Sequence, residues 1–122
     1  MRYSSRKEKA KRLQKYVAYK VAELTGLPCG KDCSIESRQM GETGPDVRLD
    51  MEARKRFPFT VECKNQETWS VPAAIKQCQA NLYDGTDWLL VLCKNRMRPV
   101  VVLDAEVFFE LLEKTKLRGR TR

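Results

Sequence analysis

Residues 44–64, GPDVRLDMEARKRFPFTVECK, place two strand-like runs on either side of a short basic insert. Asp46 opens the first run, and Glu62 and Lys64 lie two residues apart in the second. Because successive side chains of a strand point to opposite faces, Glu62 and Lys64 share one face and Cys63 takes the other. If the two runs pair as adjacent antiparallel strands, Asp46 lies beside them. The stretch therefore predicts a cluster of two acids and an amine, which suits a divalent cation next to a phosphate.

The same residues have a simpler interpretation, because charged side chains on a strand most often form a solvated face. Three features favour the cluster instead. Gly44 and Pro45 force a turn just before the first run. The alternate face of both runs is apolar, and the chain as a whole is basic. We therefore expect the acids and the amine to line a functional site.

The composition restricts the partners more than the fold. A chain of 122 residues is long enough for one domain with a modest core. It contains 24 lysines and arginines against 16 acidic residues, and its formal charge of +8 favours nucleic acid as the partner. An anionic membrane surface is the lesser alternative. No apolar run of spanning length is present in the sequence, so we expect no membrane partner.

Five cysteines and the absence of histidine limit the chemistry. An odd number of cysteines, mostly in apolar segments and without a signal peptide, predicts free thiols in a bacterial, archaeal or phage-infected cytoplasm. Cys29 and Cys33 could form a metal pair, but no second pair and no histidine complete a zinc site. Without histidine, Ser-His-Asp and Cys-His catalysis are excluded. Carboxylates, lysine and a metal ion remain.

Hydrophobic periodicity predicts the order helix, three strands, helix, two strands, helix. The first helix carries apolar residues at helical spacing from Leu13 and ends at Gly26 and Pro28. Ser70 is expected to cap the second helix, at 71–82. The strands are expected at 31–38, 46–51, 57–64, 88–93 and 100–103, with a polar turn at 52–56.

The last helix is expected to follow Asp104 as its cap. Its apolar residues are expected to pack inward, and these are Val107, Phe108, Leu111 and Leu112. Two basic segments, an arm at 1–12 and a tail at 114–122, are expected to be mobile.

The pattern PD…ExK, formed by Pro45-Asp46 and Glu62-Cys63-Lys64, resembles the signature of the PD-(D/E)xK nuclease superfamily. The resemblance spans most of the chain and implies one nuclease domain over residues 1–122. It also implies an α/β fold with a restriction-endonuclease-like αβββαβ core, in which helices flank a mixed central sheet. The order of elements read from periodicity agrees with that core.

The resemblance implies how such a site works. Asp46 and Glu62, with the backbone carbonyl of Cys63, would hold Mg²⁺, for which Mn²⁺ would substitute. Lys64 would orient a water molecule or steady the developing charge, the alternative being a structural ion pair. Gln77 matches a residue that several of these nucleases place near the scissile phosphate, the alternative being an ordinary exposed helix glutamine.

Within the superfamily the chain is most similar to archaeal-type and phage Holliday junction resolvases. That family has an acidic residue on its first helix, where this chain has Gln14. Because an amide carries no charge, Gln14 could act on the metal site through another ligand, or Glu23 or Glu8 could supply the missing acid.

The implied substrate is branched DNA, a four-way junction, recognised through its backbone rather than its base sequence. Paired nicks would require a homodimer, whose contact could involve Trp69, Met40 or the last helix. The alternatives are a VRR-type nuclease acting on flaps or forks, a basic DNA-binding module without catalysis, and a cytosolic protein-interaction domain. The residues expected to contact DNA are Arg6, Lys7, Lys11, Arg12, Ser37, Arg38, Arg54, Lys55 and Arg56.

Overall fold

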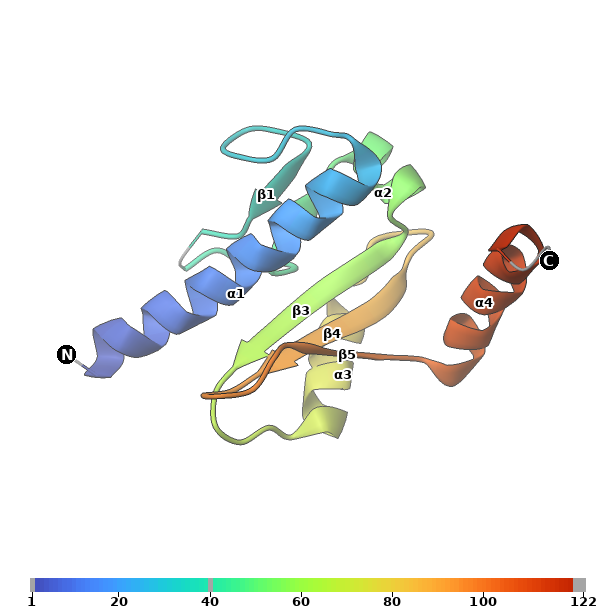
Figure 1. Cartoon of the computed structure of the whole chain (residues 1–122). Helices are drawn as coiled ribbons and strands as arrows, with labels where there is room; N and C mark the ends of the chain where they lie inside the picture. The colour runs from blue at the N-terminus through green and yellow to red at the C-terminus, as the bar shows by residue number, and fades with distance from the viewer. Residues whose placement is uncertain (1, 40, 120–122) are drawn as a thin grey trace.

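The computed structural model describes the backbone of residues 2–39 and 41–119 and the side chains of residues 6–39 and 41–115. Met40, one of the residues considered for a dimer contact, lies outside this range. Along the described chain, helices and strands alternate around a small sheet (Figure 1). The elements are α1 (Arg2–Thr25), β1 (Ile35–Ser37), β2 (Val47–Leu49), α2 (Met51–Arg56), β3 (Phe59–Asn65), α3 (Val71–Ala80), β4 (Asp87–Cys93), β5 (Val100–Leu103) and α4 (Ala105–Gly119).

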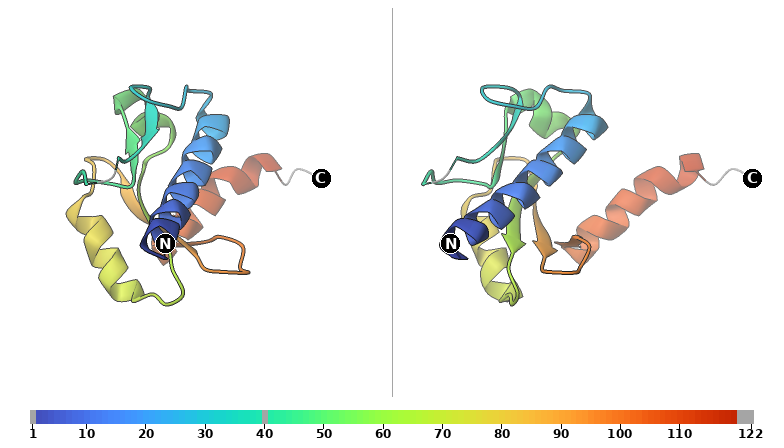
Figure 2. Two further views of the ribbon diagram at one scale, coloured as in Figure 1. Left: turned by 90° about the vertical axis from the view of Figure 1, so that its left-hand side faces the viewer. Right: turned by 60° about the vertical axis from the view of Figure 1, so that its left-hand side comes forward.

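The central sheet is mixed and has the order β3-β4-β5. β3 and β4 run parallel, with Glu62 opposite Leu90, and β5 runs antiparallel to β4. α1 crosses one face of the sheet and α3 covers the other (Figure 2). The protein is therefore a mixed α/β fold in which helices flank a three-stranded sheet.

The core has two layers, one on each face of the sheet, and this explains why the sequence of β4 is an unbroken apolar run. Val91 faces α1 and packs with Val17 and Val61, whereas Leu90 and Leu92 face α3 and pack with Cys78. A strand covered on both faces needs apolar side chains at every position. The predicted strands at 88–93 and 100–103 are confirmed.

Two segments expected to be irregular are helical. Residues 2–12 form the first half of α1 rather than a mobile arm, because they contain good helix formers and no glycine or proline. Residues 52–56 belong to α2 rather than to a turn. Asp50 caps α2, since its Oδ1 accepts a hydrogen bond from the Ala53 N–H at 2.9 Å. Ser70 occupies the cap position of α3, but its side chain makes no capping hydrogen bond.

The expected antiparallel pairing of the two signature strands is not formed as a ladder. β2 pairs with β1 in a separate two-stranded sheet, in which Glu36 lies opposite Arg48. Between the β2 and β3 segments one backbone hydrogen bond is present, from the Asp46 N–H to the Val61 carbonyl at 3.1 Å. The helix α2 between them prevents a tight hairpin. Asp46 still reaches β3 through this single link.

The prediction that the last helix packs inward is wrong. Phe108, Leu111 and Leu112 are 43%, 37% and 46% exposed, Val107 is half-buried, and α4 projects away from the rest of the chain (Figures 1 and 2). Asp104 does cap the helix, because its Oδ1 accepts hydrogen bonds from the N–H groups of Glu106 and Val107. Residues 114–119, expected in a mobile tail, continue α4, and 120–122 lie outside the described part.

The five cysteines are unpaired, as predicted. None of the described helices has the length and apolarity needed to cross a membrane.

Candidate active site

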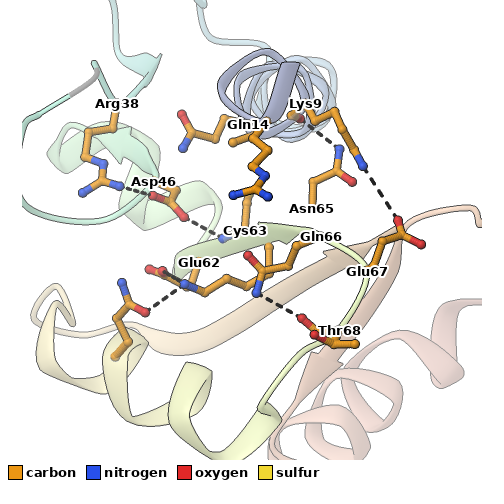
Figure 3. Close-up of a pocket in the computed structure, with 14 residues that line it drawn as sticks. Lys9, Gln14, Arg38, Asp46, Glu62, Cys63, Asn65, Gln66, Glu67 and Thr68 are labelled. Atoms are coloured by element: carbon orange, nitrogen blue, oxygen red, sulfur yellow. Dashed lines mark hydrogen bonds and ion pairs between the residues drawn. The ribbon is translucent and has the colours of Figure 1, made fainter. Parts of the chain in front are cut away.

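A pocket of about 510 Å³ opens beside the carboxyl end of β3 (Figure 3). Its walls come from the first half of α1, the segment after β1, the end of β3 and the middle of α3. The lining residues include Arg6, Lys9, Gln14, Arg38, Asp46, Glu62, Cys63, Lys64, Asn65 and Gln77. The fold thus gathers the five residues expected to be catalytic, which are Asp46, Glu62, Lys64, Gln77 and Gln14.

Asp46 is only 2% exposed and is held by two hydrogen bonds. Its Oδ1 accepts from the Arg38 guanidinium at 2.7 Å, and its Oδ2 accepts from the Cys63 N–H at 2.7 Å (Figure 3). Burial raises the pKa of this carboxyl, while the Cys63 N–H, Arg38 and Lys64 act in the opposite direction. Its position is therefore fixed by β3 and by one arginine.

Glu62 is also 2% exposed, and its pKa is raised to about 7. Burial is the main cause, and the negative charge of Asp46 adds to it. Lys64 lowers this pKa in part, with its Nζ 3.5 Å from Glu62 Oε2. Two buried carboxyl groups that repel each other in one pocket are the arrangement that a bound cation relieves.

Lys64 lies on the α3 side of β3 together with Glu62. Its Nζ donates a hydrogen bond to Gln77 Oε1 at 3.0 Å. The amine is thus held between a strand carboxylate and a helix amide, in reach of the pocket. This placement is compatible with a role on the substrate and with a structural ion pair.

Gln14 presents an unsatisfied oxygen. Its Oε1 is buried and has no hydrogen-bond partner among the described residues, although most buried polar atoms in proteins have one. Gln14 lines the pocket with both carboxylates. An amide oxygen is a ligand that hard divalent cations accept.

The Cys63 carbonyl lies on the same edge of β3 as Asp46. The Cys63 N–H points to Asp46 rather than into the sheet, and the N–H and C=O of one strand residue point to the same side. Two carboxylates, an amide oxygen and a backbone carbonyl form an oxygen donor set that fits Mg²⁺. In the part of the chain that is described, no group of three His, Cys, Asp or Glu could hold a metal ion.

The two acids considered as replacements for the missing carboxylate do not take that place. Glu23 is exposed near the far end of α1 and lies 3.9 Å from Lys20. Glu8 is exposed, and neither residue lines the pocket.

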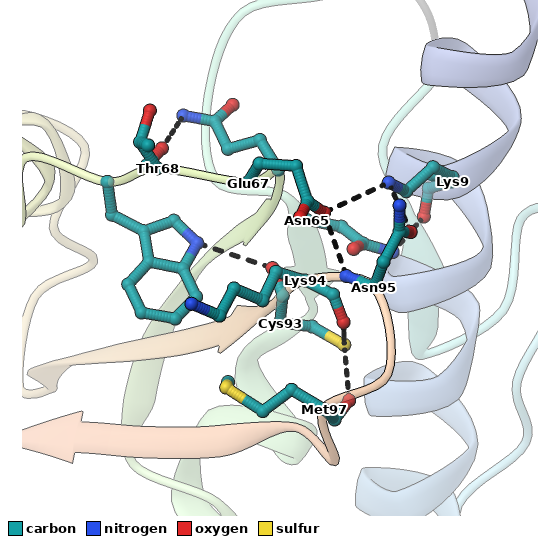
Figure 4. A network of polar contacts seen from close by, with 10 residues as sticks. Lys9, Asn65, Glu67, Thr68, Cys93, Lys94, Asn95 and Met97 are labelled. Carbon is teal, nitrogen blue, oxygen red and sulfur yellow. Dashed lines mark hydrogen bonds and ion pairs between the residues drawn. The ribbon is translucent and has the colours of Figure 1, made fainter.

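A polar network behind the pocket was not foreseen from the sequence (Figure 4). Asn65 donates a hydrogen bond to the Lys9 carbonyl at 2.9 Å, and the Lys9 Nζ donates to Asn95 Oδ1 at 2.8 Å. Glu67 accepts from the Asn95 N–H at 2.8 Å. These residues are far apart in the sequence and follow no motif. Together they hold the first half of α1 against the end of β3.

The expected DNA contacts fall into two groups. The first group lies on the pocket side and the second on α2. In the first group, Arg6 and Arg38 line the candidate active site, Lys11 and Ser37 line a neighbouring pocket, and Lys7 and Arg12 are exposed on α1. Arg54, Lys55 and Arg56 lie on α2, before the start of β3 and at the opposite end from Lys64. There Arg54 stacks 3.7 Å above the Tyr83 ring, and Arg56 donates to the Thr25 carbonyl.

The neighbouring pocket has a volume of about 320 Å³ and collects lysines that the sequence did not single out. Lys15 follows Lys11 by one helical turn on α1, and Lys31 joins them from the loop before β1. The two pockets share one wall, because Ser37 and Gln39 face this pocket and Arg38 between them faces Asp46. The lysine pocket is thus adjacent to the candidate active site.

No protein-family model, curated protein or solved structure matches the chain. Its function must therefore be inferred from the geometry of the site.

Proposed function

We propose that this protein is an Mg²⁺-dependent, structure-selective DNA endonuclease that resolves four-way junctions by hydrolysing phosphodiester bonds. The observation that carries the proposal is the pocket itself, in which two buried carboxyl groups and Lys64 lie beside an unsatisfied amide oxygen. The resemblance of the PD…ExK pattern to nucleases supports it. The cytoplasm is the compartment that goes with such an activity.

Asp46 and Glu62 would hold the cation, with the Cys63 carbonyl and Gln14 Oε1 as further oxygen ligands. When bound, Mg²⁺ would lower the pKa of a coordinated water molecule and would offset the negative charge that develops on the phosphate. Glu62, with a pKa of about 7, must lose its proton to serve as a ligand.

Arg38 and Lys64 would act on the substrate. Arg38 now balances the charge of Asp46, and a cation at Asp46 would release the guanidinium for a phosphate oxygen. Lys64, oriented by Gln77, would steady the charge developing on the phosphate.

The adjacent lysine pocket supports DNA as the substrate. Lys11, Lys15 and Lys31 offer a positive surface beside the carboxylates, where a sugar-phosphate chain could continue. Contacts of this kind follow the backbone and do not read bases, so branching rather than sequence would define the substrate. A VRR-type activity on flaps or forks uses the same site, and the choice of substrate separates the two.

A second candidate function is a DNA-binding module without catalysis. Arg38 already neutralises Asp46, and Gln14 stands where the related resolvases have an acid. In this alternative the protein binds branched DNA equally well with and without Mg²⁺.

The test is a panel of labelled four-way, flap, fork and linear duplex DNA, incubated with Mg²⁺ or with EDTA. We expect cleavage of the four-way junction with Mg²⁺ only, and its loss in Asp46→Asn, because the neutral amide lacks the negative charge that attracts the cation. Asp84→Asn is the matched control, since Asp84 is exposed and does not line the pocket.

Each outcome separates the candidates. Equal cutting of all four substrates would exclude the resolvase, and preferred cutting of flaps or forks would favour the VRR-type activity. Binding without cleavage under both conditions would favour the DNA-binding module. Undiminished activity of Asp46→Asn would remove the proposed centre.

A further inference from the structure

A small pocket adjoins the candidate active site on the α3 side of β3. It has a volume of about 190 Å³, and its walls come from the end of β3, the segment that follows it and α3. Lys64, Gln66 and Gln77 line both cavities, so the two meet at these side chains. Pockets for drug-sized ligands hold about 300–1,000 Å³, so this one suits a single ring system.

Trp69 forms the aromatic wall of the small pocket, and its ring is fixed in place. Its Nε1 donates a hydrogen bond to the Cys93 carbonyl at 3.2 Å, and the ring packs against the core layer under α3. The side chain is nevertheless only half-buried and lines the pocket. A rigid indole whose N–H already has a partner is suited to stacking on a flat ring.

The other walls of the small pocket suit a flat ring with polar edges. Ala73 and Ala74 have small side chains that leave room beside the indole. The Ser70 hydroxyl, which does not cap α3, and the amides of Gln66 and Gln77 offer hydrogen-bond donors and acceptors. Stacking on an aromatic side chain combined with hydrogen bonds to the ring edge is how proteins hold an unpaired nucleobase.

The charges around the small pocket favour a nucleotide over an uncharged ring. Lys94 Nζ lies 5.6 Å from the centroid of the Trp69 ring, and Lys64 lies where the two cavities meet. Among the described residues, no acidic side chain lines this pocket. Since every base of a strand is joined to a phosphate, lysines beside an aromatic wall are typical of sites for single-stranded nucleic acid.

We propose that the small pocket receives one unpaired base of the substrate strand, stacked on Trp69, while a neighbouring phosphate lies in the candidate active site. This inference rests on the proposed function, because it names what is recognised beside the scissile phosphate. A base inside a continuous duplex is paired and stacked, so removing it costs more than removing a base that is already unpaired. The pocket would therefore select branched DNA by structure and tolerate any sequence, because every base has a stacking face.

The experiment measures tryptophan fluorescence in EDTA. The chain contains two tryptophans, and Trp88→Phe leaves Trp69 as the only one. We expect a short oligothymidylate to quench the emission of this variant. An abasic strand of the same length should leave the emission unchanged. Both strands carry the same phosphates, so the difference between them reports the contact of a base with the indole.

Substitutions measure how much the stacking contributes to binding. Trp69→Leu should raise the dissociation constant for labelled oligothymidylate about tenfold, the size expected for one lost stacking contact, and leave binding of the abasic strand unchanged. Trp69→Phe keeps an aromatic wall and should bind nearly like the wild type. Trp88→Phe is the matched control, because Trp88 packs against the same core layer but does not line the pocket. Fluorescence anisotropy measures the binding, and circular dichroism checks the fold.

The outcomes distinguish this proposal from the proposed function. Equal quenching by both strands, quenching by neither, or unchanged binding by Trp69→Leu would overturn the base pocket. Cleavage of the four-way junction without base-dependent quenching would keep the nuclease and remove the pocket. Base-dependent quenching in a protein that cuts none of the DNA substrates would keep the pocket and remove the nuclease.

Discussion

Glu62 shows how one residue links the stability of the fold to its chemistry. Its pKa rises from the ordinary 4.5 to about 7, so between these values the folded chain holds a proton that the unfolded chain releases. The folded state therefore loses stability as the pH rises through this window, and the loss is complete above it. A bound cation would remove the penalty, because it favours the charged carboxylate.

The first prediction concerns this window. In EDTA, the free energy of unfolding of the wild-type chain should fall between about pH 4 and pH 8 by roughly 3 kcal/mol more than that of Glu62→Gln, whose side chain does not ionise. Urea denaturation at several pH values measures both. Glu8→Gln, an exposed carboxylate, should behave like the wild type. Parallel pH curves for the wild type and Glu62→Gln would show that Glu62 does not titrate in this range.

At the scale of elements, the first half of α1 depends on contacts with β3 and with the turn after β4. Asn65, the last residue of β3, donates to the Lys9 carbonyl, and the Lys9 side chain reaches Asn95. These contacts hold Arg6 and Gln14 at the rim of the candidate active site. The order of the site therefore depends on how firmly this half-helix is docked.

The second prediction follows from that docking. Asn65→Ala should destabilise the fold by about 1 kcal/mol, since one partly buried hydrogen bond is lost. Amide hydrogen exchange should accelerate mainly in residues 6–12, because α1 from Leu13 onward keeps its apolar contacts with the core. Gln66→Ala is the control, because among the described residues the Gln66 side chain bonds only to the nearby Thr68 carbonyl. Unchanged exchange in Asn65→Ala would mean that other contacts hold the half-helix.

At the scale of the whole molecule, the basic residues that give the net charge of +8 differ in whether they already have partners within the chain. Around the lysine pocket, Lys11, Lys15 and Lys31 form no ion pair with another described residue, although Glu36 also lines that pocket. On α2, Arg54 and Arg56 are engaged with Tyr83, Glu52 and Thr25 instead. The binding surface should therefore lie on the pocket side.

The third prediction compares Lys15, which lines the lysine pocket, with Lys55, which lies on α2. Lys15→Gln should lower the salt dependence of four-way junction binding by roughly 0.9 in the slope of log K against log salt, the contribution of one phosphate contact. Lys55→Gln, an exposed lysine on α2, should leave the slope unchanged. Binding titrations in EDTA at several salt concentrations measure both slopes. A reduced slope for Lys55→Gln alone would place the DNA on α2.

The sequence by itself determined part of the local structure, although residues 2–12 and 52–56, which are helical, were expected to be irregular. Periodicity located the core stripe of α1, the helix α3 and the strands β4 and β5, because these patterns depend on near neighbours in the chain. Alternation along β3 likewise placed Glu62 and Lys64 on one face, where they lie 3.5 Å apart. The cap at Asp104 was predicted for the same reason, since a cap involves residues only two or three positions away.

The tertiary structure alone decided which surfaces meet. The pairing of β2 with β1 instead of β3, the contact of Arg38 with Asp46 and the unsatisfied oxygen of Gln14 depend on segments distant in sequence. The apolar period of α4 predicted a helix with one buried face, yet Phe108, Leu111 and Leu112 are exposed in the described chain. Local pattern fixes which side of an element is apolar, whereas long-range packing fixes what that side contacts.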